Sequence, residues 1–276
     1  MKRSFFFIAF FALATLLLAN VVNAQPGPRP RQKKRVMAVG MTEGFYHDST
    51  TEALATIKEL GDESGLWETY IYTDVRAITK EKQTANRKNL DQFDAIFFMT
   101  TGELPFTAEQ KASFLSFIKD DGKGFVGAHC ATDTFYKWPE YGEMLGGYFD
   151  HHPWGTFDAP VVVEDPTHPL VKHLPKEMTL HDEIYQFKDW DRGKLRVLMA
   201  LDAKKLDLTK KDVHRADRDF AVSWVKHYGN GRVFYSTLGH TIESWRDPRL
   251  RKMWLEAMRW ALKLGPDVPV TPIAKP

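Results

Sequence analysis

The chain has 276 residues, and its 38 lysine and arginine residues nearly balance its 36 aspartate and glutamate residues, which leaves a formal net charge of +2. This balance argues against the strongly basic surface of a nucleic-acid-binding protein. The single cysteine excludes an internal disulfide, so stability must come from a packed core, for which 19 phenylalanines, 8 tryptophans and 9 tyrosines supply material.

The first 24 residues have the pattern of a secretory signal peptide. Met1-Lys2-Arg3 is basic, Ser4 to Val22 is almost wholly apolar, and Val22-Asn23-Ala24 offers compact residues at the cleavage positions. An uncleaved membrane anchor is the alternative, because the apolar run is near the length of a membrane span. The compact exit and the proline-rich stretch after it favour cleavage after Ala24. We therefore expect a periplasmic or secreted protein with no stable membrane insertion after cleavage.

The composition divides the remaining chain into three parts. Residues 25–34 read as a disordered basic leader, residues 35–265 as one α/β domain, and the proline-rich residues 266–276 as a frayed C-terminal tail. A homodimer is compatible with this organisation, although the sequence does not reveal the exposed apolar surface that would argue for one.

The first half of the domain alternates strands with helices. Apolar runs predict strands over residues 35–40, 67–72, 93–99 and 124–128. Ser49 with Glu52 and Thr107 with Gln110 form two potential capping boxes, which predict one helix from residue 49 to about 60 and another ending near Gly122. This alternation is typical of a doubly wound, mostly parallel sheet with helices on both faces.

The second half is less regular. Pro139 suits the first turn of a short helix that runs toward Leu145. The sequence Gly229-Asn230-Gly231 predicts a hairpin between two apolar runs. The other expected elements are a loop at 151–154, strands over 161–163 and 195–201, a long loop over 165–179 and a terminal helix over 249–264.

The most informative stretch follows the fourth predicted strand. The apolar run from Gly124 to Ala128 stops abruptly at His129, Cys130 and Asp133. In open α/β sheets, ligands bind beyond the carboxyl ends of the strands. The loops that follow other predicted strands carry His47, Glu103 and His240, so the fold should bring these side chains to the same edge.

Two chemistries suit such a cluster, and the residues do not choose between them. In the first, His47, His129 and His240 bind a divalent metal, most readily zinc, with Asp133 or Glu183 as a further ligand or supporting carboxylate. In the second, a histidine and a carboxylate perform metal-free acid–base catalysis on a polyol substrate.

Further candidates flank this cluster. Asp182 and Glu183 are candidates for a general base or a ligand, and His152 for a substrate contact. Glu103 and four aromatic residues are candidates for the lining of a sugar-binding cleft: Tyr46, Tyr136, Trp138 and Trp154.

Cys130 at a strand-to-helix turn suggests a third chemistry, in which its thiolate is the nucleophile. The tight nucleophile elbow has glycine two residues before and two residues after the nucleophile, where this chain has Ala128 and Thr132. A buried, inert thiol fits the sequence better.

These motifs together resemble the ThuA-like (trehalose utilisation) family. The resemblance rests on the stretch from Gly124 to Tyr136, followed by Trp138-Pro139 and Tyr141-Gly142, and on the stretch from Gly231 to His240. Thr100-Thr101-Gly102-Glu103 and Asp182-Glu183-Ile184-Tyr185 agree with it. The similarity extends from about Arg35 to Leu264.

The resemblance implies a flavodoxin-like, class I glutamine amidotransferase-like fold without implying amidotransfer. It also implies the handling of small-molecule carbohydrates, including sugars oxidised to 3-keto forms, with His129 and His240 as the residues carried over. Members of the family often have serine where Cys130 stands, which weakens the nucleophile hypothesis. We therefore expect an enzyme acting on sugars or glycosides, and the alternative is a non-catalytic carbohydrate-binding protein of the same fold.

Overall fold

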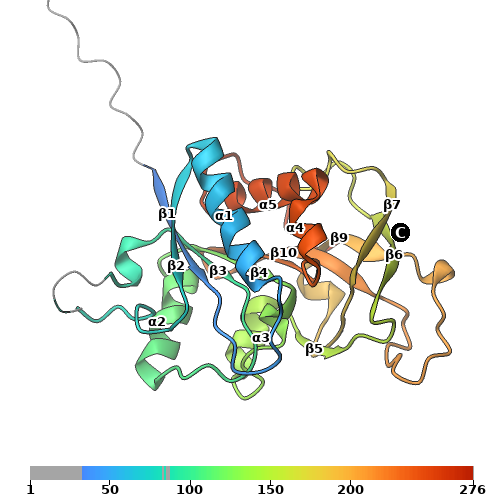
Figure 1. The fold of residues 1–276 in the computed structure, drawn as a ribbon, viewed down its shortest axis with the longest axis horizontal. Helices are drawn as coiled ribbons and strands as arrows, with labels where there is room; N and C mark the ends of the chain where they lie inside the picture. Colours follow the sequence, from blue (N-terminus) through green and yellow to red (C-terminus); the bar gives the residue numbers. More distant parts are fainter. Residues whose placement is uncertain (1–32, 83, 85–87, 276) are drawn as a thin grey trace, which may run out of the picture. The chain divides into compact units, whose positions relative to one another are not determined.

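A nine-stranded mixed sheet runs through the computed structural model, which describes residues 33–82, 84 and 88–275 (Figure 1). One half of the sheet is parallel, and its strands lie in the order β2 (Trp67–Tyr72), β1 (Lys34–Val39), β3 (Ala95–Phe98), β4 (Gly124–Ala128) and β11 (Gly231–Ser236). This is the 2-1-3-4-5 order of flavodoxin-like folds, in which the strand order reverses between β1 and β3. All five carboxyl ends therefore lie at one edge of the sheet.

The other half of the sheet is antiparallel. It continues from β11 through β10 (Ala221–Tyr228), β9 (Arg196–Leu201), β6 (Thr156–Val163) and β7 (Glu177–Glu183). The predicted hairpin is confirmed as β10 and β11. A separate two-stranded sheet pairs β5 (Tyr148–His151) with β8 (Gln186–Lys188).

Helices cover both faces of the parallel half (Figure 1). On one face, α1 (Thr50–Ser64), α4 (Ile242–Arg246) and α5 (Pro248–Ala261) contact one another, and their buried residues join one hydrophobic cluster. On the other face, α2 (Ala108–Lys119) and α3 (Pro139–Leu145) contribute to a second cluster. The predicted doubly wound α/β class is confirmed.

The two predicted capping boxes have different outcomes. Thr107 accepts a hydrogen bond from the Gln110 amide, and the Gln110 side chain accepts one from the Thr107 amide, so this box is formed. The other prediction is wrong. Ser49 precedes α1 without capping it, because its hydroxyl donates instead to the Gly239 carbonyl at 2.7 Å. Glu52 is paired with Arg246. Ser49 thus ties α1 to the loop after β11.

Helix α1 also continues past its predicted end near residue 60, and Gly61 is buried within it. A Cβ at this glycine would lie 2.5 Å from Nε1 of Trp67, whose indole donates to the Ile57 carbonyl. We therefore expect Gly61→Ala to destabilise the protein by about 1–3 kcal/mol through overpacking, although alanine is the better helix former. Urea unfolding would measure this change. Lys58→Ala on the exposed side of α1 is the control, and an equal or higher stability of the Gly61 variant would contradict the expectation.

Other differences concern short or irregular segments. Strands β5 and β8 and the short helix α4 were not predicted, and β7 occupies the end of the predicted loop at 165–179. The tail is not frayed as expected, because the Pro269 carbonyl lies 3.1 Å from His168 Nε2, the Thr271 carbonyl accepts from Arg196, and Val268 is buried.

The predicted signal peptide and most of the predicted leader lie outside the described residues. Strand β1 begins at Lys34, one residue before the predicted strand. Among the helices that the structure describes, none combines the length and the apolar character needed to cross a bilayer.

Candidate metal centre

His129 occupies the turn directly after β4. Its φ angle of 41° lies in the left-handed region, which residues other than glycine seldom adopt and which often marks a functional position. The Tyr235 hydroxyl donates to the His129 carbonyl at 2.7 Å and helps to hold this conformation. His129 Nδ1 lies 2.6 Å from the Thr237 carbonyl oxygen. Because a carbonyl only accepts, Nδ1 carries the proton and Nε2 is left with its lone pair.

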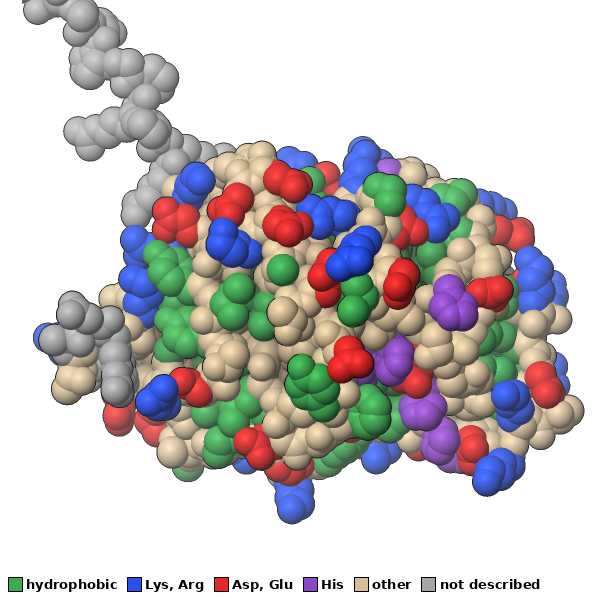
Figure 2. Space-filling view, viewed as in Figure 1, with side chains coloured by type: hydrophobic (Ala, Val, Ile, Leu, Met, Phe, Trp, Pro, Cys, Tyr) green, Lys and Arg blue, Asp and Glu red, His purple; other side chains and the backbone are tan. Residues whose placement is uncertain are grey.

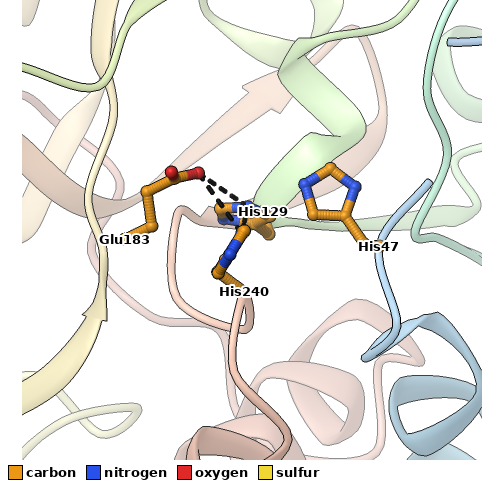
Figure 3. Close-up of side chains that lie close together, drawn as sticks. All are labelled: His47, His129, Glu183 and His240. Carbon is orange, nitrogen blue, oxygen red and sulfur yellow. Dashed lines mark hydrogen bonds and ion pairs between the residues drawn. The ribbon is translucent and has the colours of Figure 1, made fainter. Parts of the chain in front are cut away.

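Three other side chains converge on His129 Nε2. His47, His129, Glu183 and His240 each offer one ligand atom, and these four atoms all lie within 4.8 Å of one another. Glu183 Oε2 is 3.6 Å from His129 Nε2 and 3.3 Å from His240 Nδ1, and the two imidazole nitrogens are 3.2 Å apart. Figure 3 shows the four side chains pointing toward one another from separate segments of the chain. We call these four residues the His/Glu group.

The sheet topology explains how this group forms. His47 follows β1, His129 follows β4 and His240 follows β11, so the three histidines project from one edge of the parallel half. Glu183 comes from β7, at the far end of the antiparallel half. The Tyr185 amide donates to the Thr237 hydroxyl at 3.1 Å, which joins the segment after β7 to the segment after β11.

Burial keeps the histidines neutral. Burial, and then the neighbouring His240, lowers the pKa of His47 to about 4. Burial, followed by the proximity of His47, places the pKa of His129 well below its usual value, and burial also lowers the pKa of His240. Neutral imidazoles are the form that binds metal ions.

The depressed pKa of His47 predicts acid sensitivity. In metal-free protein, His47 should cost stability as the pH falls from about 6.5 to about 4, because the unfolded chain then takes up a proton that the folded chain does not. One such group contributes about 1.4 kcal/mol per pH unit in this window. The raised pKa values of Asp182 and Glu183 change stability with pH in the opposite direction. Comparison with His47→Gln therefore isolates the contribution of His47 to the pH dependence.

Urea unfolding of both metal-free proteins at several pH values is the measurement. Relative to His47→Gln, the unmodified protein should lose stability on acidification. A stability difference that stays constant between pH 6.5 and pH 4 would contradict this assignment.

The two oxygens of Glu183 face different partners. Oε2 faces His129 and His240, whereas Oε1 lies 3.6 Å from Nδ1 of His152. Burial raises the pKa of Glu183. The side chain of His152 is 43% exposed, so it connects the buried carboxylate to the surface. Figure 2 shows histidine side chains in a row on this face of the molecule, beside acidic and hydrophobic side chains.

Asp182, the neighbour of Glu183 in β7, bonds the segment that carries His240. Its buried carboxylate accepts hydrogen bonds from the Gly239 amide at 2.7 Å, the Thr241 amide at 3.2 Å and the Ser244 hydroxyl at 2.7 Å. Burial raises the pKa of Asp182 to about 6. These contacts tie Asp182 to the loop that carries His240 and to α4. The catalytic role that the sequence suggested for Asp182 stays a prediction.

Asp133 and Tyr136 form a hydrogen-bonded pair outside the His/Glu group. The Tyr136 hydroxyl donates to Asp133 at 2.5 Å, and the Lys188 ammonium lies 4.5 Å from the centre of the Tyr136 ring. Burial raises the pKa of the Asp133 carboxyl. The His/Glu group contains Glu183 and not Asp133, so the geometry favours Glu183 among the two carboxylates that the sequence left open as a further ligand or supporting group.

The remaining predicted substrate contacts are spread more widely. Trp138 is only 5% exposed and packs in the core against Phe135 and Tyr141, because so large an indole suits a buried position. The Trp154 indole donates to the Asp207 carbonyl and packs against Phe220. Neither set of contacts involves the His/Glu group. The burial of Trp138 speaks against a role in lining a cleft, whereas the role of Trp154 stays a prediction.

Glu103 and Tyr46 lie on loops at the same sheet edge. The Glu103 carboxylate accepts a hydrogen bond from the Lys137 amide at 3.0 Å. Tyr46 is 64% exposed, and its neighbour Phe45, which the sequence analysis did not single out, is 65% exposed. The Phe45 ring lies 4.9 Å from the His47 ring, centre to centre, so an exposed aromatic side chain borders the His/Glu group.

Tyr185 is the other residue that the sequence analysis missed as part of the site. Its hydroxyl lies 2.8 Å from His129 Nε2 and 3.5 Å from His47 Nε2. Its position two residues after Glu183 was the available signal.

Together, the doubly wound sheet and the buried His/Glu group at its carboxyl edge define an α/β protein whose donor set fits a metal ion. Residues 35–261 match the sequence model of the ThuA family, described as trehalose utilisation. The chain belongs to this family, as its motifs suggested, and its sheet has the flavodoxin-like strand order that the resemblance implied.

Solved structures agree with this assignment. A ThuA-like protein from Bacteroides uniformis ATCC 8492 is 26% identical, with a TM-score of 0.69 over 86% of this chain and 95% of that chain. A second one, from Parabacteroides merdae ATCC 43184, is 18% identical, with a TM-score of 0.64 over 86% and 92% of the two chains. A cytoplasmic protein from Salmonella typhimurium shares the fold at 11% identity, with a TM-score of 0.51 over 82% and 98%. The comparison with curated proteins finds no match.

Proposed function

We propose that this chain is an exported, metal-dependent enzyme that acts on sugars, glycosides or keto-sugars. The observation that carries the proposal is the convergence of His47, His129, Glu183 and His240, from four separate segments, on one point. Three imidazoles kept neutral by burial and one carboxylate fit a divalent ion, and zinc fits this donor set best. The carbohydrate substrate is supported by the family description, and export by the pattern of the first 24 residues.

The chain's own residues divide the work. His129 Nε2, His240 Nδ1 and Glu183 Oε2 would hold the ion together with His47. When bound, a divalent ion supplies Lewis acidity toward a sugar carbonyl or hydroxyl oxygen. His152, which contacts Glu183 Oε1 and is partly exposed, would move a proton to or from the substrate.

Metal analysis followed by a substrate screen tests the proposal. The mature protein, purified without a chelator or a His tag, should contain nearly one zinc, manganese or nickel ion per chain. Keto-sugars and glycosides should then be turned over, with activity lost on chelation and restored by the ion. Protein free of metal, and unable to bind zinc when it is added, would overturn the metal-dependent proposal. Metal and sugar binding without turnover would instead indicate the non-catalytic carbohydrate-binding alternative.

The cysteine hydrolase hypothesis has little support. Cys130 is 1% exposed and packs within a hydrophobic cluster. Burial, reinforced by the nearby Asp133, holds the pKa of its thiol well above the usual value. A nucleophile needs the thiolate and access to substrate, so Cys130 is better explained as a core residue.

A further inference from the structure

The phenol of Tyr185 is directed into the His/Glu group. The ring is 2% exposed and lies between His129, at 4.3 Å between ring centres, and Phe149, at 4.4 Å. Its backbone amide is held by the Thr237 hydroxyl. The hydroxyl position is therefore set by these two ring contacts and by the backbone.

The hydroxyl has two neighbours, and both are nitrogens of the group. Tyr185 Oη is 2.8 Å from His129 Nε2 and 3.5 Å from His47 Nε2. Without an ion the phenol donates to the lone pair of His129 Nε2, because His129 Nδ1 carries the ring proton. An ion that uses this lone pair removes the acceptor from the phenol. A buried hydroxyl left without a partner costs about 1–3 kcal/mol.

The distances between the donor atoms suggest that the ion itself is the other partner of the Tyr185 hydroxyl oxygen. Two donors that are each about 2.0–2.1 Å from one ion lie about 2.9 Å apart at a right angle and about 3.4 Å apart at a tetrahedral angle. His240 Nδ1 is 3.2 Å from His129 Nε2 and 3.3 Å from Glu183 Oε2. The distance from Tyr185 Oη to His129 Nε2 is 2.8 Å, just below the spacing at a right angle.

The charge of the site also favours an additional anionic ligand. Three neutral imidazoles and one carboxylate would leave a bound divalent ion with a net charge of +1 in a buried site, which is unfavourable. A phenolate would make the site neutral.

We propose that Tyr185 is a further ligand of the metal ion, bound through its phenolate oxygen. This inference rests on the proposed function, because it requires the ion. The O–H bond of the phenol breaks as the oxygen–metal bond forms, and the proton leaves to solvent. The centre would then consist of His47, His129, His240, Glu183 and Tyr185. These five donors exceed the four usual for zinc, so they would suit a divalent ion of higher coordination number, such as manganese or nickel, with room left for a substrate oxygen.

Copper(II) is a suitable probe, because it binds nitrogen and oxygen sites tightly and a copper–phenolate bond absorbs visible light. We would load the metal-free protein with one equivalent, measure the copper retained after gel filtration, and record visible absorption and resonance Raman spectra. The variants are Tyr185→Phe, which removes only the hydroxyl, and Tyr136→Phe, whose hydroxyl bonds Asp133 outside the group.

The expected result is a phenolate-to-copper band with tyrosinate Raman modes in the unmodified protein and in Tyr136→Phe. Tyr185→Phe should keep bound copper, lose the band and bind zinc on the order of 10-fold more weakly. Copper bound by the unmodified protein without tyrosinate modes would overturn the ligand assignment and leave the metal centre standing. This spectrum does not depend on whether a variant folds. Failure of the unmodified protein to bind either copper or zinc would overturn the proposed function and this inference together.

Discussion

Replacing His129 with alanine is expected to abolish metal retention. His129 Nε2 lies close to three other polar atoms, with His240 Nδ1 at 3.2 Å, Glu183 Oε2 at 3.6 Å and Tyr185 Oη at 2.8 Å. Its loss removes one ligand and leaves the remaining donors without their common neighbour. Loss even of a residue that only supports a ligand costs about 10- to 100-fold in metal affinity, so we expect at least a 100-fold loss here.

Elemental analysis and zinc titration of the two proteins would measure this loss. His181→Ala is the matched control, because His181 is an exposed histidine that pairs with Asp158 and has no place in the His/Glu group. It should bind zinc normally. Unchanged zinc affinity in His129→Ala would show that the ion, if bound, lies elsewhere.

Replacing Asp182 with alanine is expected to destabilise both the fold and the metal centre. Three donors from the loop that carries His240 and from α4, which follows it, bond this buried carboxylate: the Gly239 amide, the Thr241 amide and the Ser244 hydroxyl. Leaving these donors without an acceptor should cost about 3 kcal/mol or more in unfolding free energy. The freed loop should also weaken zinc binding, because His240 loses its fixed position.

Urea unfolding and zinc titration test the two effects separately. Asp182→Asn keeps one acceptor oxygen and should fall between the alanine variant and the unmodified protein. Asp158→Asn, at an exposed carboxylate, is the control and should alter neither quantity. Normal stability of Asp182→Ala combined with a loss of turnover would point to direct catalysis by Asp182 and against a positioning role.

Local patterns determined the class of fold and part of the site. Alternating apolar runs and helix signals sufficed for the doubly wound sheet, because β1, β3, β4 and β11 are largely buried and the helices have apolar faces. The positions of His47, His129 and His240 just after predicted strands sufficed to bring them together, because parallel strands end at one edge. The motif from Gly124 to Tyr136 also pointed to the family that the comparison establishes.

Contacts between distant segments decided the rest. Ser49 has the sequence pattern of a cap, but in the folded chain its hydroxyl donates to Gly239, 190 residues away. Trp138 has the aromatic character of a sugar contact, but the core takes it up. The sequence around Ser49 and Trp138 is compatible with either role of each residue. Only the neighbours that folding brings to each side chain distinguish the roles.

Periodicity and order along the chain were enough to predict that chemistry-bearing side chains follow the strands of an α/β sheet. Which carboxylate joins the histidines depends on contacts that form only on folding. Asp182 and Glu183 are adjacent, but side chains alternate along a strand, so one turns to the loop after β11 and the other to the histidines. That choice, like the placement of Tyr185 beside His129 Nε2, depends on how the last strand of the antiparallel half packs against the parallel half.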